Sequence, residues 1–252
     1  MWWWCVLLCV EGWYLPGVRP VDYSPGDLVD IKVTKLDSVK TQLPYEYYRL
    51  PFCPPVSDKP VRSHENLGEY LTGERIESSA YVVKIKQEET CKIACRKVLS
   101  KEQRQLFETR VVQDYRVNMI LDDMPAFVRR KMSINEEIVD VFEKGFPVGF
   151  IGNSRFGIPG VAYLFNHLKF IIHIYEVHPN QAYRIVGFEV EYFSIKHHYD
   201  GEFGPDTRLQ TCSFSSSSTN LQAVSDIEKS DEFIFTYDVV WKVIGIVMTL
   251  LI

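Results

Sequence analysis

A strict two-residue alternation of apolar side chains over two long segments is the feature that most constrains how this chain can fold. In the first segment, from Leu164 to Tyr175, one face collects Leu164, Leu168, Phe170, Ile172 and Ile174. In the second, from Tyr183 to Ile195, one face collects Val186, Phe188, Val190 and Tyr192. Because successive side chains of a strand point to opposite faces of a sheet, both segments predict long strands with one buried face.

Four other segments carry a strand signal. They are residues 28–36, 81–86, 115–121 and 233–239, which alternate in the same way or form short apolar runs between turn residues. A turn is expected directly after the third of them, at Asp122 to Pro125.

One helix is expected, from Lys101 to about Asp114. Ser100 and Gln103 have the spacing of a capping box, and the narrow apolar stripe indicates a helix on the outside of a sheet. Short strands separated by Pro, Gly and Asn, with a single helix, favour a mainly β fold. The predicted architecture is an antiparallel β-sandwich, built as one domain or as two tightly packed halves.

The balance of charge excludes one class of function. The chain has a net charge of -5 and no long run of Lys or Arg, whereas a nucleic-acid-binding protein usually carries a basic stripe. Its 46% hydrophobic content is typical of a globular protein.

Both ends of the sequence are apolar. Residues 1–10 are closed by Glu11 and Gly12 and lack a positive start, so residues 1–12 are interpreted as a partial signal peptide, with a buried strand as the alternative. Residues 239–252 are apolar except for Lys242 and Thr249, but they are fewer than the about 20 that span a membrane. They fit a buried strand, an interfacial segment or the stump of a longer one.

The cysteines indicate the redox compartment. Cys5 and Cys9 lie in the presumed signal, which leaves four candidates for disulfides: Cys53, Cys91, Cys95 and Cys212. Four cysteines allow three pairings, and the sequence does not choose among them. Two disulfides in an oxidising lumen are expected, with free cytosolic thiols as the alternative. A zinc site is disfavoured because Cys91 and Cys95 have no second close pair.

No constellation of residues indicates catalysis. Gly152, Gly157 and Gly160 lack the spacing of a phosphate-binding loop and are interpreted as turn residues. The serines of the polar loop at 213–220 lack a nucleophile elbow, and Asp122–Asp123 are interpreted as solvated turn residues. The chain is therefore expected not to be an enzyme and to have no cofactor, metal or small-molecule substrate.

The histidines are interpreted as structural, with pH sensing as a further hypothesis. His167 and His173 share a strand face but lie roughly 20 Å apart, too far for a common metal. His197 and His198 are neighbours whose side chains point in opposite directions.

An aromatic group between prolines is expected to form a loop or an edge strand. Its members are Tyr45, Tyr47, Tyr48 and Phe52. The group is interpreted either as packing at the edge of the sandwich or as a contact surface for a lumenal partner.

Several short strings occur together in one order. They are Tyr14–Gly17, Pro20–Tyr23, Thr41–Tyr45, Phe52–Cys53, Glu65–Glu69, Gly73–Ile76, Tyr115–Asp122, Asn166–Leu168, Arg184–Val190 and Phe235–Val239. Their order resembles that of nonaspanins, the transmembrane 9 superfamily. The resemblance implies that residues 13–239 form the lumenal β-rich domain that precedes nine membrane helices, and that residues 240–252 are a divergent apolar tail.

The resemblance also implies a role in sorting membrane proteins through Golgi and endosomes. The implied partners are membrane-protein clients or the family's own membrane domain, and the implied location is the lumenal side, with this chain lumenal or secreted. The rival hypothesis is a soluble secreted β-sandwich that binds carbohydrate or acts as a hydrolase. The resemblance stops inside a predicted strand, which favours a retained intron or a gene-model fault over a genuine isoform.

Overall fold

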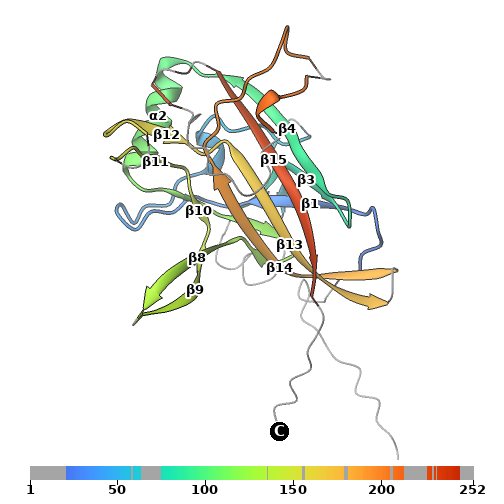
Figure 1. Cartoon of the computed structure of the whole chain (residues 1–252). Helices are drawn as coiled ribbons and strands as arrows, with labels where there is room; N and C mark the ends of the chain where they lie inside the picture. The colour runs from blue at the N-terminus through green and yellow to red at the C-terminus, as the bar shows by residue number, and fades with distance from the viewer. Residues whose placement is uncertain are drawn as a thin grey trace, which may run out of the picture.

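The structure of the chain is a computed structural model that describes most of its length (Figure 1). The described residues are 21–57, 59–63, 75–134, 136–154, 157–178, 181–204, 207–212, 226–228, 230 and 232–244. The predicted partial signal peptide, the polar loop at 213–220 and the end of the apolar tail lie outside these residues.

Two sheets form the body of the molecule. The larger has the strand order β4 (Glu89–Val98), β15 (Glu232–Val243), β13 (His167–His178), β14 (Ala182–Phe193), β8 (Phe127–Ile134) and β9 (Glu137–Lys144). The smaller has the order β2 (Arg62–Ser63), β3 (Ile76–Lys84), β1 (Leu28–Val33), β6 (Met119–Leu121) and β7 (Met124–Pro125). The mainly β, sandwich-like fold predicted from the sequence is confirmed.

Several shorter elements flank the two sheets. They are two small ribbons, β5 (Arg116–Val117) with β10 (Phe146–Pro147) and β11 (Gly149–Ile151) with β12 (Ala162–Leu164), the helix α2 (Lys101–Val112), and the 3-10 turns η1 (Tyr47–Arg49) and η2 (Gln210–Cys212).

The larger sheet is mixed rather than purely antiparallel, which corrects the sequence prediction. β13 and β15 run parallel, from the pair His167↔Thr236 to the pair Ile174↔Val243, and β14 also has a parallel pair with β8. Parallel neighbours need a connection that carries the chain back to the starting end. β14 and the residues that follow it provide that return.

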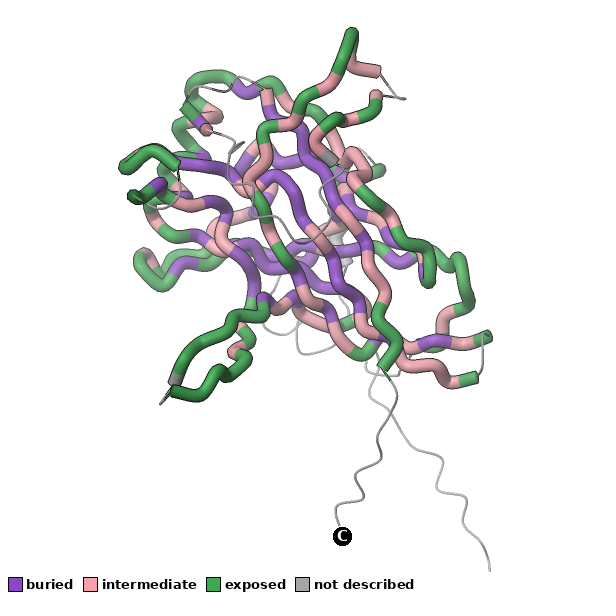
Figure 2. The backbone as a smooth tube through the Cα atoms, in the orientation of Figure 1, coloured by how far each residue is buried: buried purple, intermediate pink, exposed green. Residues whose placement is uncertain are grey.

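The core lies between the two sheets, as the buried stretches of both show (Figure 2). β1 turns Val29, Ile31 and Val33 inward, and these three side chains are buried. The inward face of β13 is buried from Leu168 to Ile174 at every second residue, as the alternation predicts. Burying each such side chain contributes about 1.5–3 kcal/mol, so this alternation is the main source of the fold's stability.

A β-bulge makes one predicted face wrong. Val186 was expected inside, but it is 42% exposed. His173 pairs with Gly187 whereas Ile174 pairs with Ile185, so Val186 is the extra residue of β14. The bulge shifts the alternation by one residue, so Ile185, just before the bulge, is buried on the same face as Phe188.

The helix is confirmed, with its capping box. The Ser100 hydroxyl accepts a hydrogen bond from the Gln103 amide at 3.3 Å, and the Gln103 side chain accepts one from the Ser100 amide at 2.9 Å. α2 ends at Val112, slightly earlier than predicted, and buries Phe107 and Val111. It packs on β11 and β12, so it covers the small ribbon rather than the outside of a large sheet.

The turn predictions hold, but several strands were not predicted, and the longest of these are β4, β8 and β9. Asp122 and Asp123 have positive φ in the turn between β6 and β7, and Gly157 and Gly160 have positive φ between β11 and β12. Neither β4 nor the hairpin of β8 and β9 was expected. Their side chains are mostly exposed or half-buried on both faces, so no buried-face alternation marks them.

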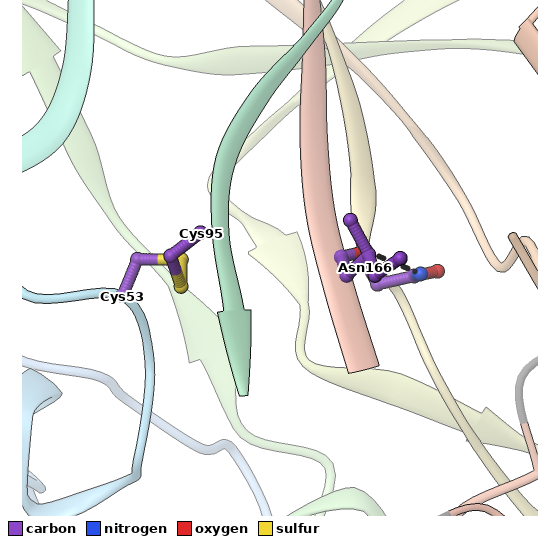
Figure 3. The surroundings of a disulfide bond; sticks show 4 residues. Cys53, Cys95 and Asn166 are labelled. Carbon is purple, nitrogen blue, oxygen red and sulfur yellow. Dashed lines mark hydrogen bonds between the residues drawn. A yellow bond between two sulfur atoms is a disulfide. The ribbon is translucent and has the colours of Figure 1, made fainter. Parts of the chain in front are cut away.

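Asn166 joins three strands through a buried side chain (Figure 3). Its amide nitrogen donates to the carbonyls of Ile195 at 2.8 Å and Ile234 at 2.9 Å, and its oxygen accepts from the Ile195 amide at 2.8 Å. The side chain therefore ties the chain after β14 and the start of β15 to the start of β13.

We expect Asn166→Ala to lower the free energy of unfolding by about 3 kcal/mol, because it leaves the buried Ile234 carbonyl and both main-chain groups of the half-buried Ile195 without this partner. Urea unfolding followed by circular dichroism measures the loss. Gln87→Ala, at an exposed position, is the matched control and should change the free energy by less than about 0.5 kcal/mol. Equal stability of the two variants would contradict this role for Asn166.

Candidate functional site: a buried histidine pair

The most chemically distinctive cluster lies on the face of β13 that points away from the smaller sheet. His167 and Ile171 are on this face, and both are buried. The chain that follows β14 folds back over the start of the strand, where the Gln210 amide donates to the His198 carbonyl and Tyr199 bridges to Leu209. The segment 197–212 thus encloses His167 and brings His197 to it.

A chain of hydrogen bonds links the two imidazoles. The Thr236 hydroxyl lies 2.8 Å from Nδ1 of His167 and 3.0 Å from Nε2 of His197. Nδ1 of His197 lies 2.8 Å from the Thr211 hydroxyl, and Nε2 of His167 lies 3.4 Å from a carboxylate oxygen of Asp238.

One arrangement of protons satisfies every link when both histidines are neutral. Asp238, ionised, can only accept, so Nε2 of His167 carries its proton and Nδ1 accepts from Thr236. The Thr236 oxygen then accepts from Nε2 of His197, whose Nδ1 accepts from Thr211. The tautomers are assigned from this network. An additional proton on either ring turns its acceptor nitrogen into a donor, so the hydrogen bond that this nitrogen accepts from a threonine hydroxyl is lost.

The electrostatics favour the neutral state of His197. Burial, together with the nearby charges of His167 and His198, lowers the pKa of His197 to about 4. Burial raises the pKa of Asp238, but hydrogen bonds from His167 and from the Cys91 amide, with the charges of His167 and Lys169, bring its pKa below the usual value. The cluster is therefore a half-buried carboxylate that contacts the imidazole of His167, which Thr236 links to the imidazole of His197.

The sequence analysis predicted that His167 and His173 are too far apart to share a metal ion, and the structure gives them different partners. The sequence analysis did not predict that His167 and His197 lie close together. His173 lies farther along β13 and contacts Glu189 of β14 at 2.8 Å, so His167 and His173 have different partners. His198 is exposed while its neighbour His197 is half-buried. Only the fold-back of the segment 197–212 brings His197 to His167, and no local pattern in the sequence marks it.

The aromatic group packs into the molecule rather than forming a contact surface. Tyr47 and Phe52 are buried and stack with ring centroids 4.5 Å apart, and Tyr45 and Tyr48 pack against the same core. The prolines leave a short 3-10 turn, η1, in place of the expected loop or edge strand. The exposure expected of a partner-binding surface is absent at Tyr47 and Phe52.

The structure contains a disulfide bond between two of the four candidate cysteines. Cys53, in the loop after η1, is bonded to Cys95 of β4, with Cα atoms 5.7 Å apart (Figure 3). Cys91 is also disulfide-bonded. Three of the four candidates, Cys53, Cys91 and Cys95, are therefore disulfide-bonded in the part of the chain that the structure describes.

Among the described residues, no group of three or more His, Cys, Asp and Glu side chains could hold a metal ion. The same part of the chain contains no helix long and apolar enough to cross a membrane. The chemistry that the cluster can perform is a change of protonation.

We expect the free energy of unfolding to fall as the pH falls from about 6.5 towards 4. Over that range the unfolded chain binds a proton at His197 that the native state, with its pKa of about 4, does not. Urea unfolding at pH 7 and pH 5 should differ by about 1–2 kcal/mol from this group. His197→Asn should remove most of that difference, whereas His198→Asn should keep it; identical pH slopes in the two variants would contradict the assignment.

Comparison with known proteins gives the family. The family model described as Endomembrane protein 70 matches residues 44–246. Transmembrane 9 superfamily member 10 of Arabidopsis thaliana is 41% identical over 91% of this chain and 36% of its own length. Transmembrane 9 superfamily member 4 of Mus musculus is 34% identical over 96% of this chain and 39% of its own length. No solved structure matches.

The chain spans little more than a third of the length of these relatives, and their names describe no enzyme. The family model and the relatives each cover most of this chain, and the range matched by the family model contains the positions of Asn166, the histidine pair and the Cys53–Cys95 bond. The chain therefore belongs to the endomembrane protein 70 family, that is, to the transmembrane 9 superfamily.

Proposed function

We propose that this chain is the lumenal domain of a multi-pass membrane protein that sorts membrane proteins in Golgi and endosomes. It acts by binding and is not an enzyme. The observation that carries the proposal is a disulfide-bonded β-sandwich in a family whose members are named for transmembrane segments.

The disulfides support the lumenal side of the membrane. Disulfide bonds persist in the secretory pathway and are rare in the reducing cytosol. The Cys53–Cys95 bond fastens the loop after η1 to β4, and Cys91 of the same strand is also bonded. Such a fold suits a domain that matures in an oxidising compartment.

The partners we propose are membrane-protein clients or the membrane domain of the same polypeptide. The relatives are more than twice as long as this chain, so the remainder of a full-length protein has room for membrane segments. The rival hypothesis, a secreted carbohydrate-binding or hydrolytic sandwich, depended on exposed aromatic platforms. Tyr47 and Phe52 are packed inside instead, which favours the lumenal domain.

A single substitution tests the lumenal placement. Val39 is 83% exposed in a turn and precedes Lys40 and Thr41, so Val39→Asn creates an acceptor for N-glycosylation. We expect a glycan when this variant replaces the matching segment of the Arabidopsis relative in a eukaryotic cell. A gel shift that a glycosidase reverses measures it, and microscopy should find the chimera in Golgi or endosomes.

Val39→Gln in the same chimera is the matched control and should show no shift. The Val39→Asn chain secreted behind an efficient signal peptide verifies that the acceptor is usable. If the secreted chain is glycosylated and the chimera is not, the segment lies outside the lumen and the proposal is wrong.

A further inference from the structure

The β8–β9 hairpin is paired with the rest of the larger sheet only at its base and projects from the sandwich beyond that point. β8 pairs with β14 at Phe127 alone, whereas β8 and β9 pair with each other from Phe127↔Lys144 to Ile134↔Glu137. Figures 1 and 2 show the hairpin extending from the body as a two-stranded ribbon, exposed over most of its length. A free ribbon of this kind is only marginally stable in water.

Apolar side chains are exposed on both faces of the ribbon. Met132, Ile138, Val139 and Phe142 have exposed fractions between 41% and 75%. Met132 pairs with Val139 on one face, while Ile138 and Phe142 lie on the other, opposite Ser133 and Arg129. Apolar surface concentrated on a projecting element indicates a partner.

The charges of the ribbon balance, which limits what that partner is. The basic residues Arg129, Arg130, Lys131 and Lys144 are matched by the acidic residues Glu136, Glu137, Asp140 and Glu143. Arg129 lies 3.4 Å from Asp140, and Arg130 lies 3.3 Å from Glu143. The ribbon therefore has little long-range attraction for a strongly charged surface, and its apolar side chains dominate what it can bind.

The end of β15 also exposes apolar side chains. β15 ends at Val243, which is 51% exposed, and the next residue, Ile244, is 44% exposed. The end of β15 and the hairpin both lie at the lower end of the molecule in Figure 1. At the start of β15, which is the opposite end, Glu232 pairs with Val98.

We propose that the β8–β9 hairpin lies on a lipid bilayer and places its apolar side chains among the headgroups. This inference rests on the proposed function and names the face of the domain that meets the membrane. Interfacial elements bury their apolar face by only about 5–10 Å, so the ribbon lies flat with the face that carries Ile138 and Phe142 toward the lipid. A zwitterionic surface matches the balanced charge of the ribbon.

Flotation of the purified full chain with phosphatidylcholine vesicles tests the proposal. We expect the wild type to float and the double variant Ile138→Glu, Phe142→Glu to lose about tenfold or more in partition coefficient, because two apolar contacts with the bilayer are replaced by charges. The matched control is Val98→Glu, Val112→Glu, which alters exposed apolar residues near the end of β4 and on α2. It should float like the wild type.

Both variants change exposed side chains, so unchanged thermal melting verifies that each still folds. Equal flotation of the hairpin variant and the wild type, or no flotation of the wild type, would overturn the proposal. So would a wild-type dimer in sedimentation without vesicles that the hairpin variant abolishes, since the ribbon would then bind a second copy. If the chimera is glycosylated but the hairpin substitutions do not change flotation, only the membrane contact of the hairpin is wrong. The lumenal placement of the domain is then still supported.

Discussion

The buried amide of Asn166 is the interaction on which the larger sheet depends. β13 and β15 run parallel, so the chain must leave β14, return, and enter β15 beside the start of β13. At that point main-chain groups of Ile195 and Ile234 would have no strand partner, and the Asn166 side chain pairs with both. An amide suits this position because it donates and accepts at once. His167 follows directly, so the same contact positions the histidine cluster.

The Cys53–Cys95 bond has a comparable role on the other side of the core. It fastens the loop after η1 to β4, and the stacked rings of Tyr47 and Phe52 fill the space between the sheets there. Phe52 also contacts Phe107 of α2, with ring centroids 5.1 Å apart. The loop, the helix and the larger sheet therefore share one aromatic cluster. This explains why a proline-rich segment that resembles a binding surface in the sequence is part of the core.

Sequence reasoning succeeded where burial is one-sided and failed where it is not. The alternation in β1 and β13 identified their buried faces because one face of each strand meets the core. It failed at Val186, since a bulge is set by the partner strand and not by local sequence. β4, β8 and β9 were missed because neither of their faces is consistently buried. His197 was missed because its contact with His167 depends on a long-range return of the chain.

The histidine cluster and the β8–β9 hairpin occupy different parts of the domain, so we expect protonation of the cluster to be independent of the proposed contact between the hairpin and a bilayer. Thr236 lies about 23 Å before Val243 along the extended β15, so the cluster lies far from the exposed end of that strand. The cluster fastens the segment 197–212, which is also tied to the start of β15 by the hydrogen bond from Tyr199 to Glu232. A proton on His197 therefore weakens contacts of that segment and leaves the pairing of β8 with β9 untouched. Because Glu232 also pairs with Arg96 of β4, the strand beneath the segment stays in place when the segment loosens.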